Sequence, residues 1–165
     1  MDRKLLTLAY IRKGERVLLG MKRRWFGAGK WNGFGGKVHE GETFATAAAR
    51  EIQEEAGVIP IGLIEVGQLD FEFEGDPLIL ETRVFVASEY EGEPQETEEM
   101  SPKWHRLDEI PYADMWDGDK YWLPLLLQGH KFKGHLLFDQ SDKVLSHKIQ
   151  PLAASKRSKR AFKMK

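Results

Sequence analysis

Residues 36–58, GKVHEGETFATAAAREIQEEAGV, are the stretch of this sequence that decides the fold. Its second half, from Thr43 to Ala56, is rich in Ala, Glu, Gln and Arg, which favour helix. Gly57 follows directly, and glycine is the residue that most often ends a helix. The stretch therefore predicts a helix over 43–56, and the glycines at 33–36 predict a loop before it.

Three glutamates of the predicted helix, Glu51, Glu54 and Glu55, fall within about 100° of its circumference. Like charges this close raise each other's pKa, and a hard divalent cation such as Mg²⁺ would remove the conflict. The alternative is a helix face that water simply solvates, as most Glu-rich faces are. Small alanines around the acids and the glycines before them favour a site, because backbone can approach closely there.

The spacing of these residues follows a known signature. Gly36, Glu42, Arg50-Glu51, Glu54-Glu55 and Gly57-Val58 stand at the spacing of the Nudix family motif without departure, and the chain resembles that family. The resemblance implies an α/β (α+β) fold, with a mixed β-sheet between helices and a loop–helix–loop that holds metal against a diphosphate. It implies Mg²⁺ as cofactor, with Mn²⁺ as a substitute.

The same resemblance assigns roles to the acidic residues. The implied metal ligands are the carbonyl of Gly36 and the carboxylates of Glu51, Glu54, Glu55 and Glu99. The implied catalytic residues are Arg50, Glu51, Glu55 and Glu99. Glu55 is the first candidate for the base that activates water and Glu99 the second, while Arg50 orients a glutamate by an ion pair.

Most of the remaining sequence, from about Thr7 to Gln128, resembles Nudix hydrolases of oxidised purine nucleoside triphosphates. The matching stretches include residues 16–43, VGQLDFEFEG (66–75) and YWLPLLLQ (121–128). The implied reaction converts 8-oxo-dGTP or 2-hydroxy-dATP to a monophosphate and pyrophosphate. The implied substrate-binding residues are Thr7, Lys22, Phe26, Asn32, Phe34, Gly35, Gly36, Lys37, Phe71, Phe73, Met100, Trp116, Asp117 and Asp119.

These residue types suit a purine. The side chain of Asn32 can both donate to and accept from a base edge. Aromatic rings stack on bases, at about 1–3 kcal/mol per base. On alternation alone, however, Phe71 and Phe73 are more typical of a core than of a pocket.

One position departs from the family pattern. The family has two adjacent aspartates that read the base edge, and this chain has Gly118 and Asp119 there. Two close carboxylates can share a proton, so that one donates while the other accepts, which broadens the range of bases that fit. We expect a narrower or altered purine selectivity, unless a shifted loop brings Asp117 into the missing place.

Two other functions stay open on the sequence. One is a Nudix hydrolase of another substrate, such as an mRNA cap, a dinucleoside polyphosphate or ADP-ribose, which the compact purine pocket disfavours. The other is a nucleotide sensor without activity on the same fold, which should have a broken motif, and this motif is intact.

Composition narrows the class of protein. The 165 residues suit one domain, which we expect over 1–152, with a basic tail over 153–165. The absence of Cys excludes disulfides, zinc–thiolate sites and iron–sulfur clusters. Apolar runs stay well short of the roughly 18 residues of a membrane span. We expect a monomer without a membrane partner in the cytoplasm, with nucleus and mitochondrion as further compartments.

The net charge of −1 conceals two unlike parts. Six Lys and Arg lie in residues 155–165, and without them 19 basic residues face 26 acidic ones. So acidic a body is unsuited to a nucleic-acid groove, which leaves the tail as the place for any nucleic-acid contact. That tail is either a solvated end or a localisation or tethering signal.

Other elements follow from hydrophobic periodicity and turn residues. A second helix is expected over 119–128, and a solvated loop over all or part of 89–99. Strands are expected over 4–11, 16–21, 64–74, 79–87, 103–107, 131–139 and 144–149.

Overall fold

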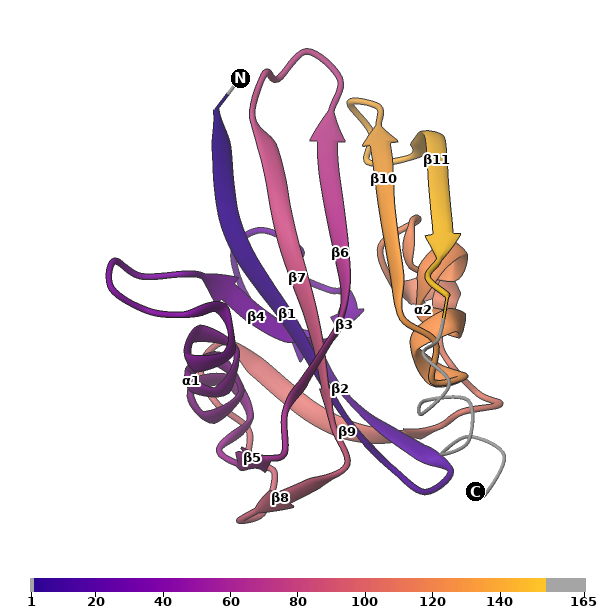
Figure 1. Ribbon diagram of the computed structural model, residues 1–165. Helices are drawn as coiled ribbons and strands as arrows, with labels where there is room; N and C mark the ends of the chain where they lie inside the picture. The colour runs from indigo at the N-terminus through magenta and orange to yellow at the C-terminus, as the bar shows by residue number, and fades with distance from the viewer. Residues whose placement is uncertain (1, 154–165) are drawn as a thin grey trace.

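The computed structural model describes residues 2–153, so the predicted basic tail lies almost entirely outside the described residues. A mixed β-sheet stands between two helices (Figure 1), which confirms the predicted fold class. The helices are α1 (Phe44–Ala56), the short 3-10 helix η1 (Tyr112–Asp114) and α2 (Asp119–Leu127). The strands are β1 (Arg3–Lys13), β2 (Arg16–Lys22), β3 (Trp31–Asn32), β4 (Phe34–Lys37), β5 (Ile59–Ile61), β6 (Ile64–Phe73), β7 (Ile79–Ala87), β8 (Glu89–Glu91), β9 (Met100–Arg106), β10 (Phe132–Phe138) and β11 (Val144–Pro151).

The sheet is organised around β1, whose two edges have different partners. One edge pairs with β7 in parallel, from Arg3 to Ile11. The other edge pairs first with β4 and then with β2, both antiparallel. The sheet continues from β7 through β6 and β10 to β11, and β2 carries β3 and β9. The segments that bear the motif are thereby fixed against the central strand.

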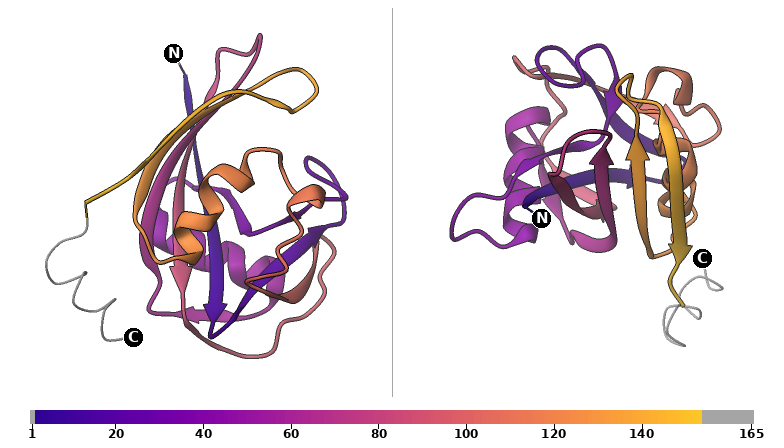
Figure 2. Two further views of the ribbon diagram at one scale, coloured as in Figure 1. Left: turned by 90° about the vertical axis from the view of Figure 1, so that its right-hand side faces the viewer. Right: turned by 90° about the horizontal axis from the view of Figure 1, so that it is seen from above.

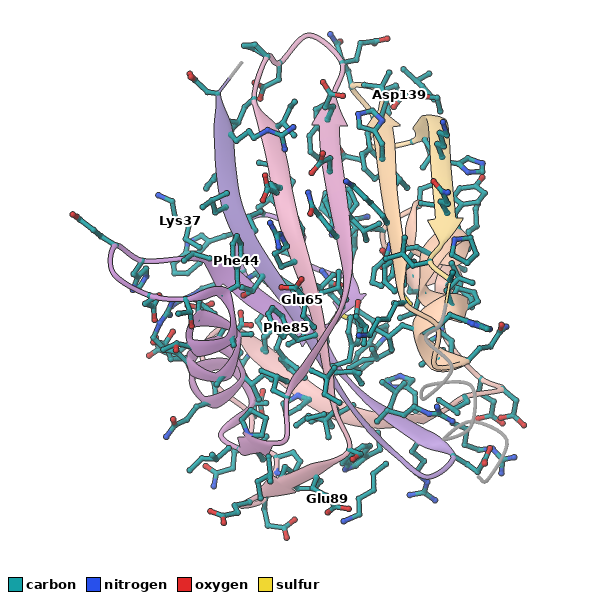
Figure 3. All side chains as sticks on the ribbon, viewed as in Figure 1. Lys37, Phe44, Glu65, Phe85, Glu89 and Asp139 are labelled. Atoms are coloured by element: carbon teal, nitrogen blue, oxygen red, sulfur yellow. The ribbon has the colours of Figure 1, made fainter. Side chains whose placement is uncertain are left out.

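Each face of the sheet is covered by one helix, and each helix seals its own core (Figure 2). Trp122, Leu123 and Leu126 of α2 pack with Tyr10 and Leu69 on one face. On the other face, α1 covers a core that includes Phe85 and is closed at its edge by Phe44; both are labelled in Figure 3. The helix face of Glu51 and Glu55 also carries the buried Ala47, Ala48 and Ile52, so α1 presents these two acids to the protein interior.

Helix α1 begins and ends where its terminal residues dictate. The hydroxyl of Thr43 accepts the N–H of Thr46 at 3.1 Å and so caps the first turn. Gly57 adopts φ +74°, and its N–H donates to the carbonyl of Gln53 at 3.0 Å. The predicted helix over 43–56 is confirmed, with Thr43 as its cap, and so is the predicted helix over 119–128, as α2.

The seven predicted strands are all present, as β1, β2, β6, β7, β9, β10 and β11. The loop predicted over 33–36 is wrong, because residues 34–37 form β4 and pair with β1. A Cβ on Gly35 would lie 1.9 Å from the carbonyl oxygen of Thr7, so glycine is what lets the two backbones meet. The acidic segment over 89–99 is loop only in part, since β8 pairs with β5. No helix among residues 2–153 has the length and apolarity needed to cross a membrane.

Candidate active site

A cavity of about 630 Å³ opens where β1, β4, β6, β7 and β10 meet the β2–β3 loop and the start of α2. It gathers most of the predicted substrate-binding residues, although they come from segments far apart in the chain. Those lining it are Thr7, Lys22, Phe26, Asn32, Gly35, Gly36, Lys37, Phe71, Phe73, Met100, Trp116 and Asp119, together with Glu55. One cavity therefore has aromatic rings at one end and the glycines and Glu55 at the other.

The aromatic end is built by contacts between rings. Phe26 lies 4.9 Å from Trp116 and 6.2 Å from Phe73, measured between ring centroids. Phe138 stacks on Phe73 at 5.2 Å and an interplanar angle of 20°. A flat ligand group can pack against these rings, because each ring is already held by its neighbours.

Polar atoms at this end are few and poorly satisfied. Asp119 is buried, lines the cavity, and has no hydrogen-bond partner at Oδ2. Burial raises the pKa of Asp119 to about 7, and Trp122 shifts it in the opposite direction. Asn32 accepts the N–H of Gly33 at 2.8 Å through its own Oδ1, so its amide nitrogen is the group left for a ligand. An unpaired buried oxygen is costly, and a base edge with N–H groups would satisfy it.

Asp117, the other predicted reader of the base, does not line the cavity. Its Oδ2 accepts the N–H of Val144 at 2.9 Å, and its Oδ1 accepts from Lys120 at 3.1 Å. A Cβ on Gly118 would lie 2.6 Å from Leu136 Cδ2 and 3.1 Å from Phe138 Cζ. The position of the missing aspartate is therefore enclosed by apolar side chains, and Asp117 ties α2 to β11 instead.

Glu55 is the acidic group at the other end of the cavity. Its Oε1 accepts the N–H of Gly35 at 2.8 Å, and its Oε2 lies 3.9 Å from the ammonium of Lys22. Burial raises the pKa of Glu55 to about 8; the Gly35 hydrogen bond opposes this and the charge of Glu51 adds to it. Lys22 also lies 3.6 Å from Glu99, so its ammonium stands between two carboxylates that approach from different segments.

Arg50 ties the remaining acids of the motif together. Its guanidinium donates to both oxygens of Glu42, at 2.8 and 3.0 Å, and to Glu51 at 2.8 Å. It reaches Glu54 at 3.3 Å and donates to the carbonyl of Lys37 at 3.0 Å. Its hydrogen bonds lower the pKa of Glu42 to about 2, while burial raises the pKa of Glu51. One cation thus joins the start of the loop to the middle of α1.

The acids of this end fit a hard divalent cation by their chemistry, since the donor set is oxygen alone. A Cβ on Gly36 would lie 2.6 Å from Glu51 Oε1, so glycine keeps open a cradle where backbone meets carboxylate. Within residues 2–153, however, no three acidic or His side chains converge as a metal cluster. The carboxylates of the set are paired with cations instead, Glu51 and Glu54 with Arg50, and Glu55 and Glu99 with Lys22.

Six predicted site residues lie outside the cavity lining. Phe34 is fully buried in the core under α1, and Asp117 is bound to β11. The others are charged residues around its acidic end, namely Arg50, Glu51, Glu54 and Glu99. Conversely, the cavity includes Trp25, Leu80 and Phe138, which were not predicted. Alternation placed Phe138 on a strand, but no sequence signal distinguishes an aromatic of a pocket wall from one of the core.

The Gly-rich strand β4, the Glu-rich helix α1 and the aromatic cavity beside them are features by which a protein family can be identified. The NUDIX domain matches residues 3–126, and the chain belongs to the Nudix family. The chain is 50% identical over 147 residues to the oxidized purine nucleoside triphosphate hydrolase of mouse (Mus musculus), covering 89% of this chain and 94% of that protein. The protein of the same name from Danio rerio is 49% identical over 146 residues, with 88% and 94% covered.

Among solved structures, a mutator MutT protein from Bacillus halodurans is similar to this chain. It matches with a TM-score of 0.81 and 26% sequence identity, over 89% of this chain and 97% of that chain. The similarity includes nearly the whole described fold and so extends past residue 126, where the domain match ends. This matters for the cavity, because Phe138 in β10 belongs to its aromatic end.

Proposed function

We propose that this chain hydrolyses oxidised purine nucleoside triphosphates, such as 8-oxo-dGTP and 2-hydroxy-dATP, to monophosphates and pyrophosphate. The observation that carries the proposal is one cavity that joins an aromatic end with a buried, unpaired Asp119 to a second end with Glu55, Lys22 and Gly36. A purine matches the first end in shape and hydrogen bonding, and phosphates match the second. The names of the mouse and Danio rerio relatives agree with this substrate class.

The residues divide the work of binding. The base packs against Phe26, Trp116 and Phe73, and its edge meets Asp119 and the amide of Asn32. The phosphates extend towards the other end of the cavity, where small residues allow backbone to approach them. The residues that would receive the phosphates are Lys22, Lys37, Gly35 and Gly36. The hydroxyl of Thr7, which is buried without a partner and also lines the cavity, is free to bond the nucleotide.

Glu51, Glu54, Glu55 and Glu99, with the carbonyl of Gly36, would hold a divalent cation, Mg²⁺ or alternatively Mn²⁺. When bound, such an ion supplies charge neutralisation for the phosphates and lowers the pKa of water. Arg50 keeps Glu51 and Glu54 in place through its hydrogen bonds. Lys22 has to share Glu55 and Glu99 with the ion, and the phosphates then offer its ammonium another partner.

Glu55 is our candidate for the base that takes a proton from the attacking water, with Glu99 as the second candidate. Glu55 lines the cavity directly, whereas Glu99 lies at its acidic margin. The burial that raises the pKa of Glu55 also makes its carboxylate a better proton acceptor. The Gly35 N–H fixes one oxygen and leaves the other directed to Lys22.

The glycine at position 118 bears on which purine is preferred. With Asp117 engaged by Val144, Asp119 is the one buried carboxylate among the described residues at the aromatic end of the cavity. Asp76 also lines the cavity, but it is exposed and accepts the N–H of Leu78. A pair of carboxyl groups can present a donor and an acceptor at two separate points of a base edge, whereas one carboxyl group presents both from a single point. We therefore expect unequal catalytic efficiency on 8-oxo-dGTP and 2-hydroxy-dATP, and equal values would contradict this part of the proposal.

The test is a panel of nucleotides, incubated with the protein and Mg²⁺, whose products are separated and identified by ion-exchange chromatography. The panel contains 8-oxo-dGTP, 2-hydroxy-dATP, dGTP, ADP-ribose, a dinucleoside polyphosphate and a cap analogue. Pyrophosphate is the product expected from the triphosphates, whereas the other compounds would release nucleotides or ribose phosphate. The expected result is selective release of pyrophosphate from the oxidised purine nucleoside triphosphates. Preference for another compound would favour a different Nudix substrate, and binding without hydrolysis would favour a sensor.

We also infer that residues 1–152 form the hydrolase domain, that it acts as a monomer in the cytoplasm, and that the tail is dispensable for catalysis. Packing of β10 and β11 onto β6 supports a domain that extends to this point. Removal of residues 153–165 should leave turnover of 8-oxo-dGTP unchanged, and light scattering of the full chain tests the monomer.

A further inference from the structure

Trp25, in the β2–β3 loop, combines features that the site described above does not use. Its φ is +65°, in the left-handed region that bulky residues rarely adopt. The residue is 67% exposed, and it lines the cavity. A strained backbone and an exposed large ring are each unfavourable, and strain of this kind collects at functional sites. Their coincidence at the cavity therefore calls for a role in binding.

The loop holds Trp25 in this conformation through its own hydrogen bonds. The carbonyl of Trp25 accepts the N–H of Ala28 at 3.0 Å, and the carbonyl of Lys22 accepts the N–H of Gly29 at 2.9 Å. The guanidinium carbon of Arg24 lies 3.9 Å from the centroid of the indole ring. Arg24 is itself held by Glu98, at 3.3 Å. An aromatic ring that is already positioned loses little conformational freedom when a ligand meets it.

The neighbours of Trp25 show which part of a ligand it would meet. Phe26 follows it directly and packs against Trp116 and Phe73 at the aromatic end. Lys22, at the base of the same loop, lies at the acidic end beside Glu55 and Glu99. The loop runs beside the segment that leads into α2 (Figure 2). Trp25 stands between Lys22 and Phe26 in the chain and lines the same cavity, so a nucleotide that reaches from Phe26 to Lys22 would come near its ring.

We infer that Trp25 is a substrate-binding residue that holds the nucleoside at the mouth of the cavity, in addition to the aromatic end that receives the base. This inference rests on the proposed function, since it takes a purine nucleotide as the ligand. Glycine at this position would relieve the backbone strain, because it has no Cβ, but it would supply no ring to the ligand.

The decisive variant is Trp25→Gly, which removes the ring and the backbone strain together. Trp25→Phe keeps a ring. Asp142→Gly is a matched control, because Asp142 is the other non-glycine residue with positive φ among residues 2–153, at +61°. It lies in the β10–β11 turn, where its N–H donates to the carbonyl of Asp139 at 3.0 Å, and it does not line the cavity. Asp139 is labelled in Figure 3. The readouts are the Kd of 8-oxo-dGMP by calorimetry, KM and kcat for 8-oxo-dGTP, and the melting temperature.

For Trp25→Gly we expect Kd and KM to rise by about fivefold to tenfold, the lower end of the effect of losing one stacked ring. We expect kcat to change less than about twofold, because an indole ring carries no group that could take a proton from water or hold a cation. The melting temperature should not fall, since the strain is relieved. Trp25→Phe should keep most of the affinity, and Asp142→Gly should bind as the unaltered protein does.

Unchanged Kd in Trp25→Gly would overturn the inference. So would a fall in melting temperature together with affinity in both Trp25 variants, because that pattern indicates a structural role. Failure of the unaltered protein to bind 8-oxo-dGMP would refute the proposed function as well, and is thus distinguishable from a failure of this inference alone.

Discussion

The two ends of the cavity deal with buried acid in opposite ways. At the acidic end, Glu55 is buried but has the N–H of Gly35 and the ammonium of Lys22 beside it. At the aromatic end, Asp119 is buried with one oxygen that has no partner. Burial raises the pKa of both groups, to about 8 and about 7. A raised pKa therefore arises in two different environments, one with donors beside the carboxyl group and one with an unpaired oxygen.

The difference follows from what each end would receive. Phosphates are anions, so an end that binds them needs cations and donors beside its own acids, and Lys22 and Arg50 supply these. A purine is neutral and flat, so the other end is apolar and leaves a polar atom free for the base edge. Three variants test this difference between the two ends, one for catalysis, one for the buried acid and one for ion pairing.

The largest effect is expected at Glu55. Glu55→Gln keeps an oxygen for the Gly35 N–H but removes the base, so kcat for 8-oxo-dGTP should fall by about 10²- to 10⁴-fold. Binding of 8-oxo-dGMP, measured by calorimetry, should stay within about threefold. Glu65→Gln, in an exposed ion pair with Arg83, serves as the control and should retain kcat. Near-normal turnover of the Glu55→Gln variant would exclude Glu55 as the base.

The second effect concerns stability and pH at Asp119. Burial raises its pKa in the folded protein from 3.8 to about 7. Between these values the folded state holds a proton that the unfolded state has lost, so this group makes the protein less stable as pH rises from about 4 to 7. Asp119→Asn removes this loss. The measured quantity is the unfolding free energy of the variant minus that of the unaltered protein. This difference should be about 3 kcal/mol larger at pH 8 than at pH 5.

Urea unfolding of both proteins at pH 5 and pH 8 checks this value. Other groups with raised pKa, Glu55 among them, are present in both proteins and cancel in the comparison. An equal difference between the two proteins at both pH values would mean that Asp119 is ionised throughout, and the contrast between the two ends would then disappear.

The acidic end was largely predictable from sequence, and the aromatic end was predictable only through family resemblance. Helix α1 carries its own cap at Thr43 and its own end at Gly57, so the placement of Glu51 and Glu55 is a local matter. The aromatic end depends on distant pairings, such as that of β10 with β6, which brings Phe138 to Phe73. Periodicity identifies each strand but does not pair them.

The wrong prediction of a loop over 33–36 and the placement of Asp117 both depend on contacts with distant segments. Residues 34–37 look like loop because glycine is a poor strand former, and they pair only because β1 offers an edge from the start of the chain. Asp117 and Asp119 are two residues apart, yet only Asp119 reaches the cavity. The N–H of Val144 draws Asp117 away, and nothing near position 117 in the sequence signals this bond.

The smallest effect is expected at Arg50, where the variant weakens the ion pairs of the acidic end. Arg50→Lys keeps the charge but loses the two-pronged contact with Glu42 and the reach to Glu51. The unfolding free energy at pH 7, measured by urea unfolding, should fall by about 1–2 kcal/mol, because lysine cannot reproduce the planar fork of arginine.

Arg106→Lys provides a matched control for this variant. Arg106 donates to the two oxygens of Asp108 through Nε and Nη2, each at 3.0 Å. These two side chains are 61% and 66% exposed, whereas those of Arg50 and Glu42 are 22% and 15% exposed. Solvent screens such a pair, so the loss there should be smaller than at Arg50 and close to the error of the measurement. Equal losses at both positions would show that the geometry of the fork decides the energy. A larger loss at Arg50 is the expected result, because Arg50 is shielded from water and also bonds Glu51 and the carbonyl of Lys37.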